Sequence, residues 1–246
     1  MQRRDDTVIA NASGTAPAEL AKFSAIAAHW WDADGPMSAL LAMNPARTDW
    51  IMERIRTRYG AGPTRVLDVG CGAGVLCESL ARAGCNVTGL DAAPETIAAA
   101  QTHAARSGLS IDYRTGTVAD LRKNNERYPV ITALEIIEHV ECPQDFLSNL
   151  SGLLESNGIL FLSTINRTAR SFLFAKIGAE YLLRLLPVGT HAWSKFIRPD
   201  ELAQQLREAG LRVTDITGMA PDRSVRHFRA TPDIRVNYMA MAVAGG

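Results

Sequence analysis

Short apolar runs alternate with segments of helical character along most of the chain from Thr64 onward. A short apolar run that ends in glycine or polar residues predicts a buried strand. The predicted strands are Arg65 to Val69, Asn86 to Leu90, Ser110 to Tyr113, Val130 to Leu134, Ile159 to Ser163, Leu211 to Ile216 and Val236 to Ala244. The predicted helices are Val75 to Ala83, Pro94 to Gly108, Pro143 to Leu154 and Pro199 to Ala209.

This alternation predicts an α/β, doubly wound fold. Strands that alternate with helices form right-handed βαβ units, which give a mostly parallel sheet with helices on both faces. We therefore expect a seven-stranded sheet. The last two predicted strands have no helical pattern between them, so they should form an antiparallel hairpin at the sheet edge.

The remaining segments predict additions to this domain, which spans residues 63–246. Residues 1–18 are small and polar, and we expect a disordered tail. Residues 19–62 have a helical pattern with a break at Asp34-Gly35-Pro36, which predicts a helical N-terminal cap. A further helical insertion is expected after the fifth strand, at about residues 168–190.

Three glycines follow the first predicted strand, at the point where a helix begins. Gly70, Gly72 and Gly74 allow a sharp turn and the close approach of a ligand to the backbone. The dinucleotide-binding pattern places its last glycine three positions after the second, where this chain has Val75. Together with the terminal hairpin, this spacing favours S-adenosylmethionine and a class I methyltransferase fold. A nicotinamide-dependent oxidoreductase is the alternative.

Two carboxylates complete the predicted cofactor site. Asp91 ends the second strand, where it can accept both ribose hydroxyls. Asp68 lies within the glycine motif and can hold the ammonium group of the methionine moiety, or act only as a turn residue. We expect the adenine to lie beside Leu134, with Thr117 and Val118 at its edge.

Composition narrows the class of protein. The 246 residues include 26 basic and 26 acidic side chains, so no overall charge favours nucleic acid as a partner. The four cysteines show no C-x-x-C spacing, which suits buried thiols in a reducing compartment. The N-terminus resembles no secretory signal, and no apolar run reaches the roughly 20 residues of a membrane span.

A second group of reactive side chains follows the fourth predicted strand. Glu135, Glu138 and His139 are spaced so that they would share one face of a helical turn. Two carboxylates and an imidazole suit a divalent cation with oxygen-rich coordination. A solvated turn whose charges compensate one another is an equally good interpretation.

From about Glu19 to Met241 the chain resembles the ubiquinone-biosynthesis O-methyltransferases. The similarity depends on motifs outside the glycine loop. These motifs are Lys22-Phe23, Trp30-Trp31-Asp32, Gly35, Asn44-Pro45-Ala46-Arg47, Glu135-Ile-Ile-Glu-His-Val, Ser163-Thr164-Ile165-Asn166-Arg167, Gly178-Ala179-Glu180-Tyr181-Leu182, Gly189-Thr190-His191, Lys195-Phe196-Ile197 and Val236-Asn237-Tyr238-Met239.

The resemblance implies methylation of catechol hydroxyls on polyprenylated ubiquinone precursors, at two steps of the pathway. It implies that Arg47, Gly70, Asp91 and Leu134 contact S-adenosylmethionine. It also favours the metal interpretation of the second group, with magnesium or zinc held by Glu135, Glu138 and His139. It also suggests a ubiquinone-biosynthesis complex as partner. The chain departs from the family pattern at Ala192 and at Ala220-Pro221, which leaves the accepted ring substituents open.

The chemistry requires that the acceptor oxygen lose its proton. A phenol has a pKa of about 10. Either a bound cation held by Glu135, Glu138 and His139 lowers that pKa, or His139 or His191 acts as the general base. A structural role for His191 is also open.

The insertion between the fifth strand and the next helix is unusually apolar. Residues 170–187 combine an apolar stripe with basic side chains. Since a polyprenyl substrate resides in the bilayer, we expect this segment to contact anionic membrane, or to close the acceptor pocket as a lid. The expected location is cytoplasmic, at the inner face of the bacterial membrane.

Two further functions are also compatible with the sequence. One is a methyltransferase for another small phenol or acid. The other is a catalytically weak, lipid-binding assembly factor that keeps the fold and the cofactor.

Overall fold

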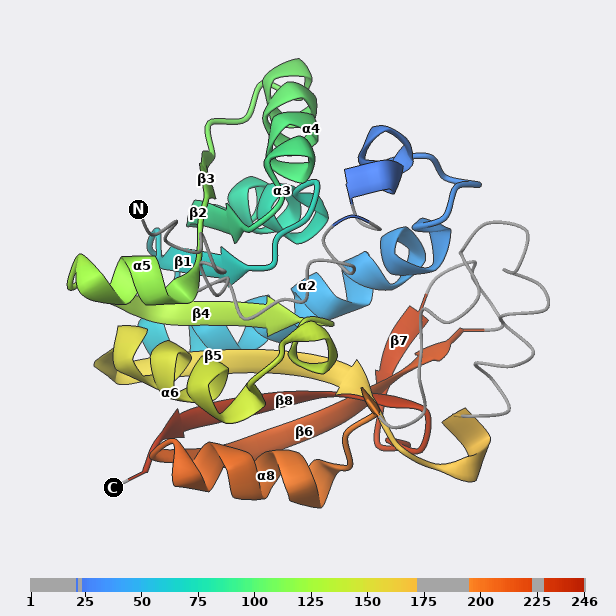
Figure 1. Ribbon diagram of the computed structural model, residues 1–246. Helices are drawn as coiled ribbons and strands as arrows, with labels where there is room; N and C mark the ends of the chain where they lie inside the picture. The colour runs from blue at the N-terminus through green and yellow to red at the C-terminus, as the bar shows by residue number, and fades with distance from the viewer. Residues whose placement is uncertain (1–20, 22–23, 172–194, 223–227, 246) are drawn as a thin grey trace, which may run out of the picture.

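A single eight-stranded sheet organises the protein in the computed structural model, which describes residues 21, 24–171, 195–222 and 228–245. The strand order is β3-β2-β1-β4-β5-β8-β6-β7 (Figure 1). The strands are β1 (Arg65–Val69), β2 (Asn86–Asp91), β3 (Asp112–Thr115), β4 (Tyr128–Leu134), β5 (Leu154–Ile165), β6 (Leu211–Pro221), β7 (Phe228–Thr231) and β8 (Asn237–Ala244).

Strands β1 to β5 are parallel, as the alternating pattern predicts. β8 is antiparallel to both β5 and β6, which confirms the antiparallel character of the last strands. The predicted count of seven was one too few because β7 is short, has Arg229 in its middle and contains no buried residue. β7 pairs with the end of β6, so it forms the sheet edge in place of the predicted terminal hairpin.

The helices cover both faces of the sheet, which confirms the doubly wound prediction (Figure 1). The helices are η1 (Ala27–His29), α2 (Ser38–Tyr59), α3 (Val75–Arg82), α4 (Pro94–Arg106), α5 (Val118–Lys123), η2 (Ile137–His139), α6 (Pro143–Leu153) and α8 (Pro199–Glu208). Residues of α2, α3 and α4 pack into one apolar core, and residues of α5, α6 and α8 into another.

Local signals account for where several helices begin. Proline occupies the first position of α4, α6 and α8, where a missing backbone N–H costs nothing. The short helix α5 was not predicted. Its start is stabilised by Thr117 and Asp120, each of which accepts a hydrogen bond from the other's backbone N–H.

The N-terminal cap is held mainly by α2. Trp50, Ile51 and Ile55 of this helix are buried in the core that α2 shares with α3 and α4. Arg54 lies over the Trp50 ring and also pairs with Asp215 of β6 at 2.6 Å. The cap is therefore attached to the sheet and does not form a separate domain core.

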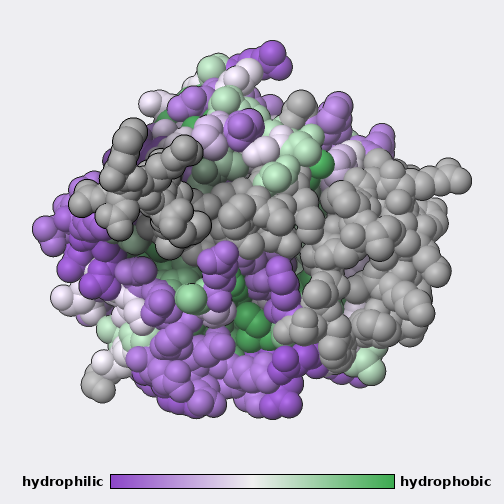
Figure 2. All heavy atoms as spheres, in the orientation of Figure 1, coloured by the Kyte–Doolittle hydropathy of each residue, from purple (hydrophilic) through white to green (hydrophobic). Residues whose placement is uncertain are grey.

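On the face shown in Figure 2, the described surface is mostly hydrophilic, and strongly hydrophobic residues show mainly in a recess near its centre. Ile216 is the only large apolar side chain exposed within the described ranges. None of the described helices has the length and apolar character needed to cross a membrane. Most of the predicted helical insertion falls in residues 172–194, outside the described residues.

Candidate active site

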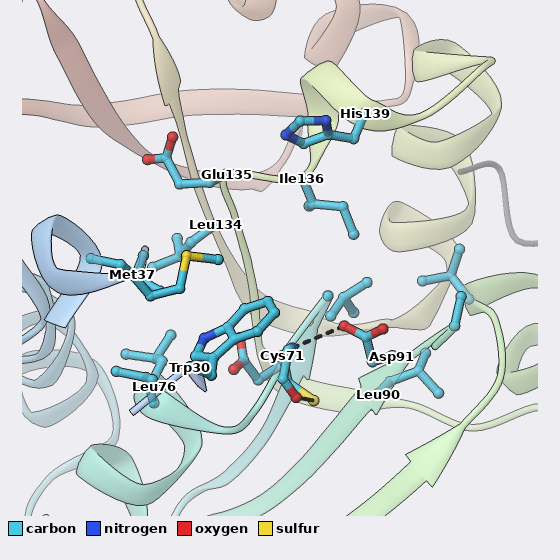
Figure 3. A pocket seen from close by; sticks show the side chains of 18 of the residues that line it. Trp30, Met37, Cys71, Leu76, Leu90, Asp91, Leu134, Glu135, Ile136 and His139 are labelled. Carbon is cyan, nitrogen blue, oxygen red and sulfur yellow. Dashed lines mark hydrogen bonds between the residues drawn. The ribbon is translucent and has the colours of Figure 1, made fainter. Parts of the chain in front are cut away.

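A pocket lies at the carboxyl ends of β1, β2 and β4, where ligands bind in open α/β sheets. Its walls come from the glycine loop after β1, the ends of β2 and β4, and the helical cap (Figure 3). The predicted site residues that line it are Arg47, Asp68, Gly70, Gly72, Asp91, Thr117, Val118, Leu134, Glu135 and His139. Gly74 and Glu138 do not line it, and His191 lies outside the described residues.

The glycine loop needs glycine for two reasons. Gly70 and Gly72 have φ angles of 69° and 53°, which L side chains rarely adopt. A Cβ atom at either position would also lie under 3.0 Å from a neighbouring side chain, Ile136 at Gly70 and Trp30 at Gly72, so the neighbour would have to shift. Gly74 lies against the Tyr113 hydroxyl and is not among the lining residues of the pocket, so its predicted contact with the cofactor stays a prediction.

Asp91 joins the loop to the next helix. Its carboxylate accepts hydrogen bonds from the backbone N–H of Gly72 and of Ala93, both at 2.9 Å. Burial raises the pKa of Asp91 above its ordinary value, while these two bonds act in the opposite direction. An ionised carboxylate has about four acceptor positions. Asp91 also lines the pocket, so its carboxylate oxygens are within reach of a ligand bound there.

Asp68 lies deeper in the same pocket. It accepts hydrogen bonds from the Thr132 hydroxyl at 2.6 Å and from the Cys77 thiol at 3.2 Å. Burial raises the pKa of Asp68 to about 6, while the hydrogen bonds from Thr132 and Cys77 act in the opposite direction. A cationic ligand group at this position would favour the ionised form of Asp68 and would be bound by it in return.

Arg47 connects the cap to the end of β4. Its Nη2 atom donates to Glu135 Oε1 at 2.5 Å, and the same oxygen accepts from the Ser163 hydroxyl at 2.8 Å. Glu135 has a φ of 53°, and its backbone N–H is held by Ser163. A non-glycine residue in this conformation costs about 1–3 kcal/mol, which the surrounding contacts must offset.

Glu138 points away from the pocket. It is buried and accepts a hydrogen bond from the Thr164 hydroxyl at 3.1 Å. Burial, and next the nearby charge of Glu135, raise the pKa of Glu138 to about 8. Burial therefore favours the protonated form of its carboxyl group.

These positions do not support the predicted metal centre. Glu135 is paired with Arg47 and Ser163, and Glu138 with Thr164, so their oxygens do not converge with the His139 imidazole. Within the described part of the chain, no three acidic, histidine or cysteine side chains are grouped to hold an ion. The three cysteines buried in the first half of the domain, Cys71, Cys77 and Cys85, are free thiols, as expected.

Two aromatic lining residues were absent from the predicted site. Trp30 reaches the pocket from the cap, and Phe146 reaches it from α6. Neither follows a strand, so the rule that places ligands at strand ends does not identify them. In the sequence, Trp30 and Trp31 stand out only as part of a motif that resembles the O-methyltransferase family.

Comparison with known proteins distinguishes among the families that share this fold. Residues 43–216 match the family model of a methyltransferase domain. The chain is 45% identical to the ubiquinone biosynthesis O-methyltransferase of Xanthomonas euvesicatoria pv. vesicatoria over 235 residues, 95% of this chain and 97% of the relative. The chain belongs to the ubiquinone biosynthesis O-methyltransferase family.

A second family member, from Pseudomonas savastanoi pv. phaseolicola, is 44% identical over 223 residues, 90% of this chain and 94% of the relative. Among solved structures, the magnesium protoporphyrin IX methyltransferase of Synechocystis PCC 6803 with bound SAH has a TM-score of 0.59 and 23% identity. The match covers 80% of this chain and 82% of that one, and it shows the shared fold.

The family resemblance inferred from the sequence is thus confirmed. This ubiquinone biosynthesis O-methyltransferase homologue is an S-adenosylmethionine-dependent O-methyltransferase. The nicotinamide-dependent oxidoreductase considered above is wrong, because a methyltransferase family accounts for nearly the whole chain.

Glu138→Gln tests whether this O-methyltransferase contains a buried, protonated carboxyl group. The folded-state pKa of about 8 exceeds the ordinary value of 4.5, so the stability of the wild type falls as pH rises between these values. Glutamine does not titrate. We expect the variant to be more stable by about 1–3 kcal/mol at pH 8 and nearly equal to the wild type at pH 4.5, measured by urea denaturation.

Glu155→Gln is the matched control, because Glu155 is exposed and pairs with Arg65 on the surface. Its effect should stay within about 0.5 kcal/mol at both pH values. If the wild type were the more stable protein at pH 8, by a margin that grows with added magnesium, Glu138 would be an ionised metal ligand.

Proposed function

We propose that the enzyme methylates catechol hydroxyls of polyprenylated ubiquinone precursors, at two steps of the pathway. The support is the identity of 44–45% to proteins named for ubiquinone biosynthesis, over nine tenths or more of the chain. The main structural support is the pocket. Its acidic residues Asp91 and Asp68 lie at different depths, which suits the two polar ends of S-adenosylmethionine.

The polar ends of the cofactor would be recognised by three charged side chains. Asp91 would accept the ribose hydroxyls with its remaining lone pairs, and Asp68 would bind the methionine ammonium group. Arg47 would bind the cofactor's carboxylate. In support, Arg47 Nε is buried and has no hydrogen-bond partner among the described residues, although a buried donor of this kind normally has one.

The adenine would occupy the apolar end of the pocket. Val118 and Leu134, with Leu90 and Phe146, provide apolar contact there. Thr117 lies beside them at the start of α5, where its hydroxyl is already engaged with Asp120. The adenine would therefore be held mainly by packing at its faces, and by backbone groups at its edge.

The methyl-transfer step needs alignment and a proton acceptor. S-adenosylmethionine supplies a methyl group that is already activated as a sulfonium. The pocket would hold the acceptor oxygen in line with it, which is the main contribution of such enzymes to the rate. His139 lines the pocket and would take the acceptor proton as general base. His191 is the alternative base, in a segment outside the described residues.

A divalent cation remains implied by the resemblance, yet the residues do not fit one as they stand. Glu135 would have to exchange Arg47 for the cation, and Glu138 would have to turn away from Thr164. We therefore derive no step through a metal ion.

Membrane contact through residues 170–187 completes the proposal. A polyprenylated acceptor resides in the bilayer, and the basic and apolar side chains of this segment suit an anionic surface. The enzyme would then act at the inner face of the membrane, alone or within a ubiquinone-biosynthesis complex. Of this segment only Arg170 and Ser171 are described.

Asp91→Ala should weaken the binding of S-adenosylmethionine by about 2–4 kcal/mol, because the ribose hydroxyls lose a charged acceptor. Isothermal titration calorimetry measures this directly. Asp112→Ala is the control, since Asp112 pairs with Arg114 at the start of β3, outside the pocket. Equal affinities for the wild type and Asp91→Ala would rule out the proposed ribose contact.

His139→Ala should lower the turnover number by about 10²–10⁴-fold, the usual contribution of a general base. The affinity for S-adenosylmethionine should stay within a few-fold, because the imidazole acts on the acceptor. The exposed His29, which pairs with Asp32 on the cap, provides the control variant His29→Ala. Undiminished turnover in His139→Ala would move the base to another residue.

The acceptor is tested by product mass spectrometry with a panel of catechols. We expect mono-methylated product from prenylated catechols, formed faster when long-chain acceptors are presented in anionic vesicles than in neutral ones. High salt should reduce that difference. An enzyme that methylates only unprenylated phenols or acids would contradict the proposed substrate, and one that binds all ligands without turnover would indicate an assembly factor.

A further inference from the structure

Trp30 forms part of the inner wall of the cofactor pocket. Its side chain is buried, and the six-membered part of the indole lies close to Gly72 of the glycine loop. Figure 3 shows the indole at the pocket, near Cys71 of the same loop. It packs with Ala73 and Val75 in a small apolar cluster of its own. The indole therefore covers the loop from the side of the cap.

The neighbouring Trp31 fixes this position from outside the pocket. Its indole N–H donates to the carbonyl of Ala73 at 2.9 Å. The Trp31 ring also stacks on His103 of α4, with centroids 3.6 Å apart and planes 3° from parallel. His103 is paired in turn with the fully buried Glu78 of α3 at 2.6 Å. The cap is thus docked on α3, α4 and the loop, and Trp30 is held in place.

The acidic groups of the pocket leave the positive charge on the cofactor sulfur without a partner. In the placement proposed above, Asp91 binds the ribose, and Asp68 binds the ammonium group at the other end. Glu135 is neutralised by Arg47. The sulfonium lies between the ribose and the amino acid part of S-adenosylmethionine, along the loop that Trp30 covers.

Aromatic side chains are the remaining groups that attract a cation. Of the described lining residues, Trp30 and Phe146 are aromatic. Phe146 belongs to the apolar core formed with α5 and α8, on the other face of the sheet from α2, α3 and α4. Trp30 lies on the loop itself, and indole is the best of the aromatic groups for attracting a cation.

We propose that Trp30 is a specificity-determining residue that recognises the positive charge on the cofactor sulfur through its π face. The inference rests on the cofactor placement under the proposed function. The sulfur is a charged sulfonium before methyl transfer and a neutral thioether afterwards. Trp30 therefore favours the methyl donor over the demethylated product, S-adenosylhomocysteine, and helps the product to leave.

The test is the ratio of two affinities measured by calorimetry, for S-adenosylmethionine and for S-adenosylhomocysteine. A cation–π interaction contributes about 0.5–2 kcal/mol. Trp30→Leu should therefore lower the preference for the sulfonium form by about 2–30-fold. Trp30→Phe, which keeps an aromatic face at a similar loss of volume, should retain most of that preference. Equal weakening of both ligands in Trp30→Leu would overturn the inference.

Trp31→Phe is the matched control, because it alters the docking of the cap without changing a pocket wall. It should weaken both ligands by the same factor. Asp91→Ala tests the cofactor placement separately from the role of Trp30. If Asp91→Ala binds both ligands as the wild type does, the cofactor placement is wrong. If Asp91→Ala weakens binding but Trp30→Leu leaves the ratio unchanged, only the role of Trp30 is wrong.

A second measurement avoids the removal of the side chain. Incorporating fluorinated tryptophan weakens the negative potential of the indole face while preserving its shape. The preference for S-adenosylmethionine should fall in the labelled wild type and stay constant in labelled Trp30→Phe. An equal change in both proteins would show that another tryptophan is responsible and would overturn the assignment.

Discussion

The carboxylate of Asp91 joins two backbone segments, the glycine loop at Gly72 and the start of α4 at Ala93. Both segments must present their N–H groups to the same side chain, which sets the path of the loop between β1 and α3. That path requires the left-handed conformations of Gly70 and Gly72 and brings Ile136 and Trp30 against the loop. The pocket exists because the chain is held in this turn.

The Arg47–Glu135 pair makes the corresponding connection between cap and sheet. Arg47 belongs to α2, and Glu135 follows β4, so a nearly buried ion pair joins elements far apart in sequence. Breaking such a pair by removing one partner leaves an uncompensated charge, which costs about 3–5 kcal/mol. The strained backbone of Glu135 is tolerated because Arg47 and Ser163 hold its side chain and its N–H. The cap, the loop and the end of β4 thus form one connected wall.

The parallel strands and the residues at their carboxyl ends could be predicted from the sequence. The parallel strands were predictable because each is a short apolar run that ends in glycine or polar residues. Gly70, Gly72, Asp91 and Leu134 could be located because parallel strands place their carboxyl ends at one sheet edge. β7 was missed because its four residues, two of them exposed and none buried, show no apolar run.

The sequence pattern could not predict where the side chains that follow β4 point. The spacing of Glu135, Glu138 and His139 predicts a shared face only if all three lie on one helical turn. The structure instead has Glu135 in a left-handed conformation, before a 3-10 turn that begins at Ile137. Trp30 could not be placed either, because its position follows from the docking of the cap. That docking depends on Glu78, His103 and Ala73, which are distant in sequence.

The place of β8 in the sheet has a consequence for how the protein is made. β8 lies between β5 and β6, so among the described strands β6 and β7 join the parallel part of the sheet by strand pairing only through β8. During synthesis on the ribosome, β1 to β5 can pair as they emerge, while β6 and β7 wait for a partner that is translated later. In that interval β5 presents an open edge of backbone donors and acceptors, which is a site for wrong pairing between nascent chains. β8, which follows β6 and β7 in the chain, is thus the strand that closes the sheet.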